Sequence, residues 1–466
     1  MERISTGNAA ADRILDGGFP RNSIHILMGL PGTGKTILAQ QMAFAHAGSG
    51  RPVLYLTTLS EPLAKVVTYL QSYRFADLDR IGTEVLYEDL GGDLAKAPEE
   101  LPERLLALIQ QHRPSLIIID SFKALSDLMP DRGTWRRVLY RLAGLLSAYD
   151  TTSFWVGEYT ADSIGHLPEF AVADGIVELT REQRGSRDTR YLRIVKLRGS
   201  DFLDGQHAFR ITAEGLDIYP RLVTPRLTLD YTASPERLLS GIGGLDPMIE
   251  RGWLRGTITL VLGPSGAGKT VLGLHFLREG VRLGEPGLLV GFQENPVQLA
   301  RVIRNFGWDP EDLLVPNKLD LLYASPVEMQ IDMVVRELFR RLDAQGVRRI
   351  VIDAVADLER SARDPARFRD YLYALGQHLA VRNITALFLM EATGQDHPAG
   401  LISGKEVSYL SDNVVWLEMH LEETLKRTIR IIKSRGSAHT GRRHALHITA
   451  QGLVVEHDSH PEFAQP

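Results

Sequence analysis

A glycine-rich phosphate-binding pattern occurs twice in this chain, and no other sequence feature constrains its fold as strongly. The two copies read Gly29-Leu30-Pro31-Gly32-Thr33-Gly34-Lys35-Thr36 and Gly263-Pro264-Ser265-Gly266-Ala267-Gly268-Lys269-Thr270. Each copy follows a short apolar run, which predicts a strand, and precedes a segment of helical periodicity (37–46 and 271–279). A strand, such a loop and a helix in this order aim backbone N–H groups at the phosphates of a nucleotide. The sequence therefore predicts two nucleotide-binding loops.

The positions within each loop have distinct predicted roles. Lys35 and Lys269 are expected to reach the β- and γ-phosphates, and Thr36 and Thr270 are expected to hold Mg²⁺. The remaining phosphate contacts are expected from Gly29, Gly32, Thr33 and Gly34 in the first loop and from Gly263, Ser265, Gly266, Ala267 and Gly268 in the second. ATP and Mg²⁺ are the cofactors that this pattern implies.

The internal repeat extends well beyond the two loops. Matching residues of the segment 3–36 recur without a gap at 237–270. A Lys-x-Arg-Gly-Ser sequence also closes each half, at 196–200 and at 433–437. A repeat of this length indicates two homologous domains. We expect a first domain at 1–222, a linker at 223–235, a second domain at 236–455 and a flexible tail at 456–466.

Short apolar runs alternate with amphipathic segments in each half. Runs such as 53–56 and 116–120 are typical of strands in a parallel sheet that is covered on both faces. Near the end of each half, apolar and polar residues alternate (191–196 and 428–433), which predicts antiparallel hairpin strands. The predicted fold class is α/β, used twice: a mainly parallel sheet flanked by helices, with a C-terminal antiparallel hairpin.

The composition of the 466-residue chain is that of an ordinary globular protein, with 44% hydrophobic and 24% charged residues. The chain contains no cysteine, which excludes disulfides and thiolate zinc sites. No apolar run is long enough to span a bilayer, so we expect a cytoplasmic protein without a membrane partner. A formal net charge of −5 gives no general attraction to nucleic acid, which is therefore not favoured as a partner.

Acidic residues that end or follow apolar runs are candidates for metal binding and catalysis. Asp120 and Asp353 are expected to hold the water shell of Mg²⁺. Hydrolysis also needs a carboxylate that orients the attacking water, and Glu294 follows a predicted strand in the second half. In the first half the same register contains Ser60, and Glu61, one position later, is a further catalytic candidate. Alternatively, both glutamates are solvated acids that the helix dipole favours at helix starts.

These features resemble the KaiC family of circadian-clock ATPases, within the RecA-like superfamily. The matching elements are the tandem P-loops, the paired Lys-x-Arg-Gly-Ser sequences and the turn at 294–296, within about residues 1 to 455. The resemblance implies two tandem RecA-like P-loop NTPase domains and a double-ring homohexamer with ATP between neighbouring subunits. KaiC-like proteins carry adjacent glutamates after the second strand, whereas this chain has Leu59-Ser60 and Gln293-Glu294. We therefore expect the second ring to be the more active one, while the first binds ATP and holds the assembly together.

The resemblance also implies a role for the basic pairs Lys196 and Arg198, and Lys433 and Arg435. On that architecture these side chains point at the γ-phosphate of the adjacent subunit. A cation donated by a neighbour neutralises transition-state charge and makes catalysis depend on assembly. Residues i and i+2 of a strand share a face, so both members of a pair can address one target. The alternative is that they are basic residues on a solvated strand edge.

KaiC itself autophosphorylates a neighbouring serine and threonine in its second half. Ser408 occupies the serine position here, and Tyr409 replaces the threonine. Ser408 is therefore the candidate phosphosite, because positioning a hydroxyl near a γ-phosphate does most of the catalytic work. Alternatively, Ser408 is only a cap or turn residue.

Taken together, the sequence predicts a hexameric ATPase of KaiC type that transmits its nucleotide state to a regulatory protein partner, with candidate serine/threonine autokinase activity. One rival function is a RecA-like DNA-binding ATPase of recombination or repair, since the superfamily includes such motors. Another is an ATP-gated scaffold with little turnover.

Overall fold

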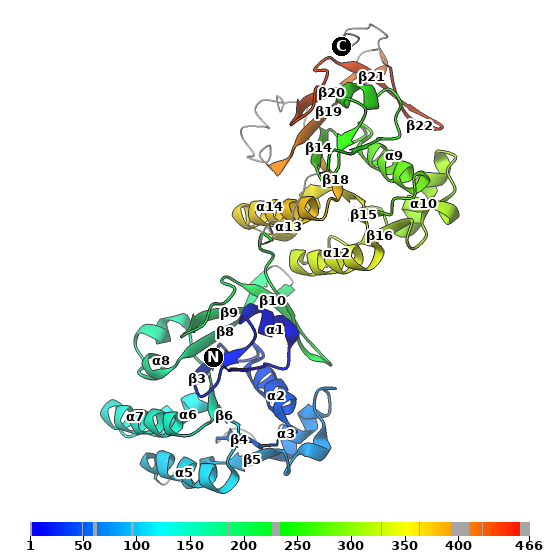
Figure 1. Ribbon diagram of the computed structural model, residues 1–466. Helices are drawn as coiled ribbons and strands as arrows, with labels where there is room; N and C mark the ends of the chain where they lie inside the picture. Colours follow the sequence, from blue (N-terminus) through cyan, green and yellow to red (C-terminus); the bar gives the residue numbers. More distant parts are fainter. Residues whose placement is uncertain are drawn as a thin grey trace. The chain divides into compact units, whose positions relative to one another are not determined.

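The computed structural model (Figure 1) describes residues 2–48, 50–58, 63–94, 97–184, 187–225, 234–327, 329–362, 364–392, 410–421 and 423–456. The chain divides into two compact units, Met1–Arg221 and Leu222–Pro466. Glu61 and Ser408, together with Leu59, Ser60 and Tyr409, lie outside the described residues. No helix among the described residues is both long enough and apolar enough to cross a membrane.

The first unit is built on a nine-stranded sheet in the order β11-β10-β9-β8-β3-β7-β6-β4-β5. The strands from β5 to β8 in this order run parallel, and β9, β10 and β11 add antiparallel pairs. The strands are β3 (Ile24–Met28), β4 (Val53–Thr57), β5 (Val85–Asp89), β6 (Leu116–Asp120), β7 (Thr152–Gly157), β8 (Gly175–Arg184), β9 (Arg187–Leu197), β10 (His207–Thr212) and β11 (Gly215–Tyr219), with a separate pair β1 (Arg3–Ile4) and β2 (Phe19–Pro20).

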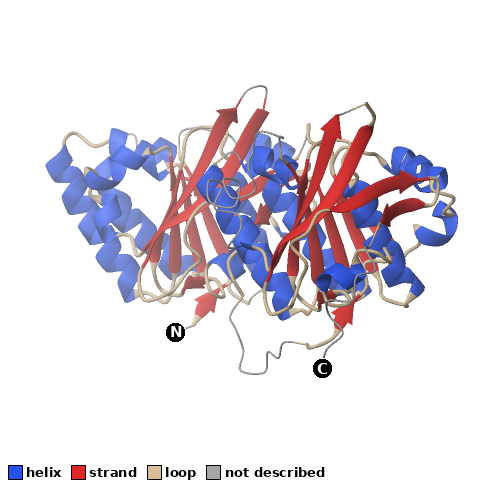
Figure 2. Ribbon diagram, turned by 90° about the horizontal axis from the view of Figure 1, so that it is seen from above, coloured by secondary structure: helices blue, strands red, loops and turns tan. Residues whose placement is uncertain are grey.

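Helices cover both faces of this sheet, as Figure 2 shows. One apolar core lies between the sheet and α2, and the other lies between the sheet and α5, α6 and α7. The helices are α1 (Ala9–Ile14), α2 (Lys35–His46), α3 (Leu63–Leu70), α4 (Gly91–Leu94), α5 (Leu101–His112), α6 (Phe122–Asp127), α7 (Arg132–Ala148) and α8 (Glu169–Val172), with 3-10 turns at Leu78–Arg80, Pro98–Glu100 and Ala161–Gly165.

The second unit repeats this topology, with the sheet order β16-β15-β17-β18-β14-β19-β20-β21-β22. Its strands are β14 (Ile258–Gly263), β15 (Gly287–Gly291), β16 (Leu319–Tyr323), β17 (Arg349–Asp353), β18 (Thr385–Glu391), β19 (Asn413–Leu421), β20 (Leu425–Ser434), β21 (His444–Thr449) and β22 (Gly452–Val455), with the pair β12 (Arg237–Leu238) and β13 (Trp253–Leu254). Its helices are α9 (Lys269–Arg282), α10 (Pro296–Asn305), α11 (Pro310–Leu313), α12 (Ile331–Gln345), α13 (Val355–Ala362) and α14 (Pro365–Val381), with a 3-10 turn at Asp246–Ile249.

The predicted fold is confirmed: each unit has a mostly parallel sheet flanked by helices and ends in antiparallel hairpins. The helices that follow the two P-loops begin two residues earlier than their apolar periodicity indicated. Gly34 and Gly268 adopt left-handed backbone angles (φ 104° and 106°), and the helix starts at the next residue, the P-loop lysine. Only glycine reaches such angles without a steric penalty, so the motif itself sets where the helix begins.

Candidate nucleotide-binding sites

Each P-loop leaves the carboxyl end of a strand near the middle of its sheet. The first loop follows β3, which lies between β7 and β8, and the second follows β14, which lies between β18 and β19. A Cβ atom at Gly29 would lie 2.1 Å from the carbonyl oxygen of Leu179, and one at Gly263 would lie 2.7 Å from that of Leu417. The first glycine of each motif therefore lets the loop start in close contact with the neighbouring strand.

The P-loop lysines bend back over their own loops. Lys35 Nζ donates to the carbonyl oxygen of Leu30 at 3.0 Å, and Lys269 Nζ donates to those of Gly263 and Pro264 at 2.8 and 2.9 Å. Burial lowers the pKa of both lysines, and nearby carboxylates oppose this shift. Each ammonium group therefore lies above the loop, where the β- and γ-phosphates of a bound nucleotide would meet it.

The P-loop threonines contact the predicted metal-binding aspartates directly. Thr36 Oγ1 donates to Asp120 Oδ2 at 2.8 Å, and Thr270 Oγ1 donates to Asp353 Oδ2 at 2.6 Å. Burial is the main reason why the pKa of Asp353 rises to about 6, and the charge of Glu294 adds to this rise. Hydroxyl and carboxylate oxygens are the hard ligands that Mg²⁺ prefers, so the residues present fit this ion in both domains.

Glu294 lies next to the second of these clusters. It follows β15, precedes the N-cap residue Asn295 of α10 and is half-buried. The preceding residue, Gln293, donates through Nε2 to Asp357 Oδ2 at 3.1 Å, and Asp357 is only 1% exposed. Arg360 Nη1 holds the other oxygen of Asp357 at 2.8 Å. The segment that carries Glu294 is therefore tied to α13, the helix that follows Asp353.

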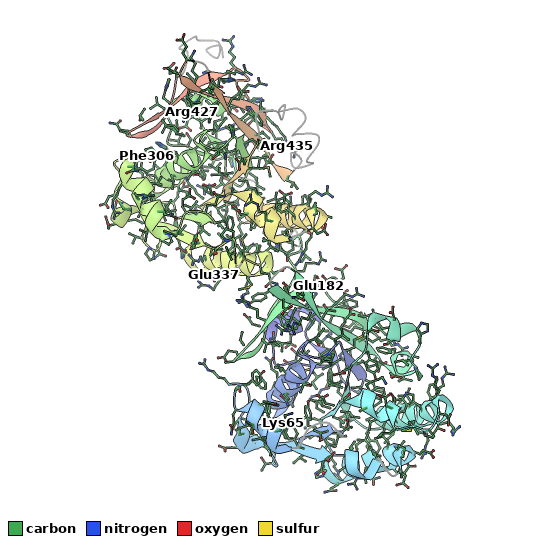
Figure 3. The ribbon with its side chains drawn as sticks, turned by 180° about the vertical axis from the view of Figure 1, so that it is seen from behind. Lys65, Glu182, Phe306, Glu337, Arg427 and Arg435 are labelled. Atoms are coloured by element: carbon green, nitrogen blue, oxygen red, sulfur yellow. The ribbon has the colours of Figure 1, made fainter. Side chains whose placement is uncertain are left out.

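The structure does not bring the Lys-x-Arg pairs to the P-loop of their own domain. Lys196 pairs with Ile176 and Lys433 pairs with Val414, near the starts of β8 and β19. Because β8 and β19 run parallel to the P-loop strands, the pairs lie at the edge of the sheet opposite to the P-loop. Figure 3 labels Arg435 at the end of β20.

Within their own domain the lysines of these pairs bind backbone carbonyl groups. Lys196 Nζ donates to Ala173 at 2.6 Å and to Phe170 at 3.3 Å, and Lys433 Nζ donates to Ser411 at 2.6 Å. Burial, followed by the charge of the adjacent arginine of the pair, lowers the pKa of both lysines. Each lysine thus holds the segment that leads into the last parallel strand of its domain.

Two residue pairs at the candidate nucleotide sites belong to no sequence motif and were not predicted. Arg190 Nε donates to the P-loop carbonyl oxygen of Gly32 at 3.4 Å, and Arg427, labelled in Figure 3, donates in the same way to Gly266 at 3.0 Å. Glu158 and Glu391 follow or end the strands beside the P-loop strands and act electrostatically on Lys35 and Lys269. The signal that could have revealed them is the internal repeat, since both arginines and both glutamates occupy equivalent positions in the two halves.

The geometry defines the class of protein: two tandem RecA-like P-loop NTPase domains, each with a lysine, a threonine and an aspartate gathered at the carboxyl edge of its sheet. The chain belongs to the KaiC family of ATPases, because the family model matches residues 4–223 and 238–460.

Curated relatives cover nearly the whole chain. The circadian clock oscillator protein KaiC of Picosynechococcus is 29% identical over 94% of this chain and 86% of its own length. KaiC 1 of Synechocystis is 28% identical over the same shares. KaiC of Synechococcus elongatus is 29% identical over 92% of this chain and 84% of its own length.

Proposed function

We propose that the protein binds Mg·ATP in both P-loops and hydrolyses it, with Glu294 as the catalytic carboxylate of the second domain. The observation that carries this proposal is the contact between the P-loop threonine and a strand-end aspartate beneath the P-loop lysine, present in both domains. This is the arrangement that phosphoryl-transfer sites use to position a metal-bound triphosphate.

The residues of the chain divide the work of catalysis. Lys35 and Lys269 bind phosphate oxygens, while Thr36, Asp120, Thr270 and Asp353 hold the metal ion and its water shell. When bound, Mg²⁺ neutralises charge on the phosphate oxygens. Glu294 orients the attacking water and takes its proton as the water oxygen bonds to the γ-phosphorus. The bond from that phosphorus to the bridging oxygen breaks, and ADP leaves with phosphate.

We further propose that the protein acts as a homohexamer whose nucleotides lie between neighbouring subunits. The γ-phosphate of the neighbouring subunit would then be contacted by Lys196 and Arg198 in the first domain and by Lys433 and Arg435 in the second. Their position at the sheet edge opposite to their own P-loop supports a target outside their own domain. Binding of the γ-phosphate by Lys196 or Lys433 would compete with the carbonyl contacts of these side chains and so loosen the segments that they hold.

The same assembly would present Ser408 to a γ-phosphate and give the protein serine autokinase activity. The relatives that match this chain are named clock oscillator proteins. On this basis we propose that the nucleotide state of the rings is passed to a regulatory protein partner, with Ser408 as the phosphosite.

The test is incubation of the purified protein with γ-labelled ATP and Mg²⁺, following free phosphate and protein-bound label together. Lys269→Ala and Glu294→Gln should each remove most phosphate release, by about 10²-fold or more for the second-domain site. Lys35→Ala should remove the smaller part of phosphate release, which comes from the first domain. Ser408→Ala should abolish protein-bound label without lowering phosphate release.

Light scattering with and without Mg·ATP completes the test, since the proposal expects the mass of a hexamer with nucleotide. A protein that stays monomeric at saturating Mg·ATP, or that releases no phosphate under any of these conditions, contradicts the proposed function. Bound label that survives Ser408→Ala contradicts the assignment of the phosphosite alone.

A further inference from the structure

A further carboxylate lies at each nucleotide site, at the carboxyl end of the strand between the P-loop strand and the aspartate strand. In the second domain, β18 lies between β14 and β17, and its last residue, Glu391, is the direct cross-strand partner of Gly263. In the first domain, Met28 pairs with Gly157, so the next residue, Glu158, lies beside the start of the first P-loop. Both domains therefore place a glutamate next to the first glycine of the motif.

Strand alternation puts these carboxylates on the nucleotide side of the sheet. Leu387 and Leu389 belong to the apolar core that contains α9, and Glu391 follows them with the same parity. In the first domain, Phe154 and Val156 belong to the core that contains α2, and Glu158 continues that series. The helices α2 and α9 begin at the P-loop lysines, so each glutamate shares a face with its own phosphate-binding loop.

The charge of these glutamates acts on the phosphate-binding lysines. Burial lowers the pKa of Lys35, and the charges of Glu158 and Asp120 oppose this shift, that of Glu158 more strongly. In the second domain, Glu391 opposes the lowering of the pKa of Lys269 more strongly than Asp353 does. Both glutamates are exposed, and neither makes a hydrogen bond or an ion pair with another described residue.

A free carboxylate beside a triphosphate site is electrostatically unfavourable, because like charges at short range repel. Its presence in both domains therefore calls for a chemical role, and a carboxylate near a γ-phosphate can accept the proton of an attacking water. The first domain needs such a group most, since Ser60 stands at the position of Glu294.

We propose that Glu158 is the catalytic carboxylate of the first domain and that Glu391 assists Glu294 in the second. This inference rests on the proposed ATP hydrolysis. In the first domain the water oxygen bonds to the γ-phosphorus, the bond to the bridging oxygen breaks, and the proton of the water passes to Glu158. The carboxylic acid then returns the proton to solvent as ADP and phosphate leave.

The experiment measures turnover of the first domain alone, in full-length protein with Lys269→Ala. In this background Glu158→Gln should lower phosphate release by about a hundredfold or more, since general-base groups contribute this much. Binding of a fluorescent ATP analogue should change less than about threefold, because the amide keeps the size of the side chain. The matched control is Asp162→Asn, an exposed acid of the neighbouring 3-10 turn, which should leave turnover unchanged.

A parallel series in the Lys35→Ala background isolates the second domain. There Glu391→Gln should lower phosphate release less than Glu294→Gln does. Full turnover by Glu158→Gln in the Lys269→Ala background overturns the inference. So does a complete lack of phosphate release by Lys269→Ala itself while Lys35→Ala is active, and in that case the proposed ATP hydrolysis by the second domain still stands. Only a wild-type protein that releases no phosphate would remove both proposals together.

Discussion

The two domains share the predicted phosphate-binding and metal-binding residues, but the first domain has Ser60 where the second has Glu294, and the residues behind these groups also differ. The lysine, the threonine–aspartate contact, the arginine over the P-loop and the strand-end glutamate occur in both. Three supporting positions differ: Arg349 stands where the first domain has Leu116, His275 where it has Gln41, and Asp357 where it has Ala124. The predicted phosphate-binding and metal-binding residues thus occur in both domains, while the residues that surround them differ from one domain to the other.

The largest difference is a buried charge cluster that only the second domain contains among the described residues. Arg349, which is fully buried at the start of β17, donates through Nε to Glu285 at 2.7 Å and through Nη1 to the carbonyl oxygens of Leu239 and Phe276 at 2.7 and 3.0 Å. Arg255 binds the other oxygen of Glu285. Gly280 leaves room for this arginine, since a Cβ there would lie 2.5 Å from Arg349 Cδ.

Replacing Arg349 by the residue of the first domain, Arg349→Leu, should destabilise the second domain by about 3–5 kcal/mol. Loss of one member of a buried ionic cluster leaves its partners without compensation. The measurement is hydrogen exchange of the β17 amides by mass spectrometry, with the β6 amides of the first domain as an internal reference.

The control is the double variant Arg349→Leu with Glu285→Gln. It should recover part of the lost stability, because the ionised carboxylate that has lost its Arg349 partner is then replaced by a neutral amide. Unchanged protection of β17 in the single variant would show that the cluster is not what stabilises this domain.

The sequence predicted the duplicated fold because the fold depends on local patterns, and the same patterns are the basis of the proposed phosphate-binding residues. The P-loop fixes a strand, a turn and a helix start within eight residues, and apolar runs that end in Asp120 and Asp353 mark the sheet edge. Contacts between distant segments were not predictable in this way. Gln293 and Asp357 lie on different elements, and a glutamate at a strand end, such as Glu391, has no spacing that distinguishes it from a solvated residue.

The second difference concerns the hydrogen bond that ties the P-loop helix to the last hairpin of each domain. In the first domain Gln41 Oε1 accepts from the backbone N–H of Leu216 at 3.1 Å. In the second, His275 Nε2 accepts from that of Leu453 at 2.9 Å. Burial, followed by the charge of Arg278, lowers the pKa of His275 to about 4, so the imidazole is neutral in the folded protein at pH 7.

This difference predicts an acid sensitivity of the second domain to which His275 contributes and which His275→Gln should reduce. Burial also lowers the pKa of His25 in the first domain to about 4, and that contribution is the same in wild type and in His275→Gln. At His275 the unfolded chain binds the proton near pH 6.5 and the folded chain only near pH 4, so the stabilisation is complete above pH 6.5 and declines as the pH falls. The contribution of His275 should fall by about 2 kcal/mol between pH 7 and pH 5.

The measurement is the pH dependence of the free energy of unfolding of wild type and of His275→Gln. Burial raises the pKa of Asp332 and of Asp353 to about 6. The stability that these two groups contribute is therefore lost as the pH rises, whereas that of His275 is lost as the pH falls. They are present in both proteins and cancel in the comparison. Parallel pH profiles for the two proteins would rule out His275 as the source of the sensitivity.

The smallest predicted effect concerns the support of Glu294. Asp357 accepts from Gln293 and from Arg360, and it thereby connects the loop after β15 to α13. The first domain has Leu59 and Ala124 at the positions of Gln293 and Asp357, so it lacks both partners of this contact. If the contact positions Glu294, its removal should slow the chemical step and leave nucleotide binding largely intact.

Asp357→Ala, which copies the first domain, should lower kcat about tenfold in the Lys35→Ala background, with a change in the KM for ATP below about threefold. Asp357→Asn keeps an acceptor oxygen for Gln293 and should retain most of the rate. Glu359→Ala, at an exposed position of the same helix, serves as the matched control and should not alter kcat. A purely structural role for Asp357 would instead lower thermal stability without separating kcat from KM. In that case the catalytic difference between the domains would lie in Glu294 itself and not in what holds it.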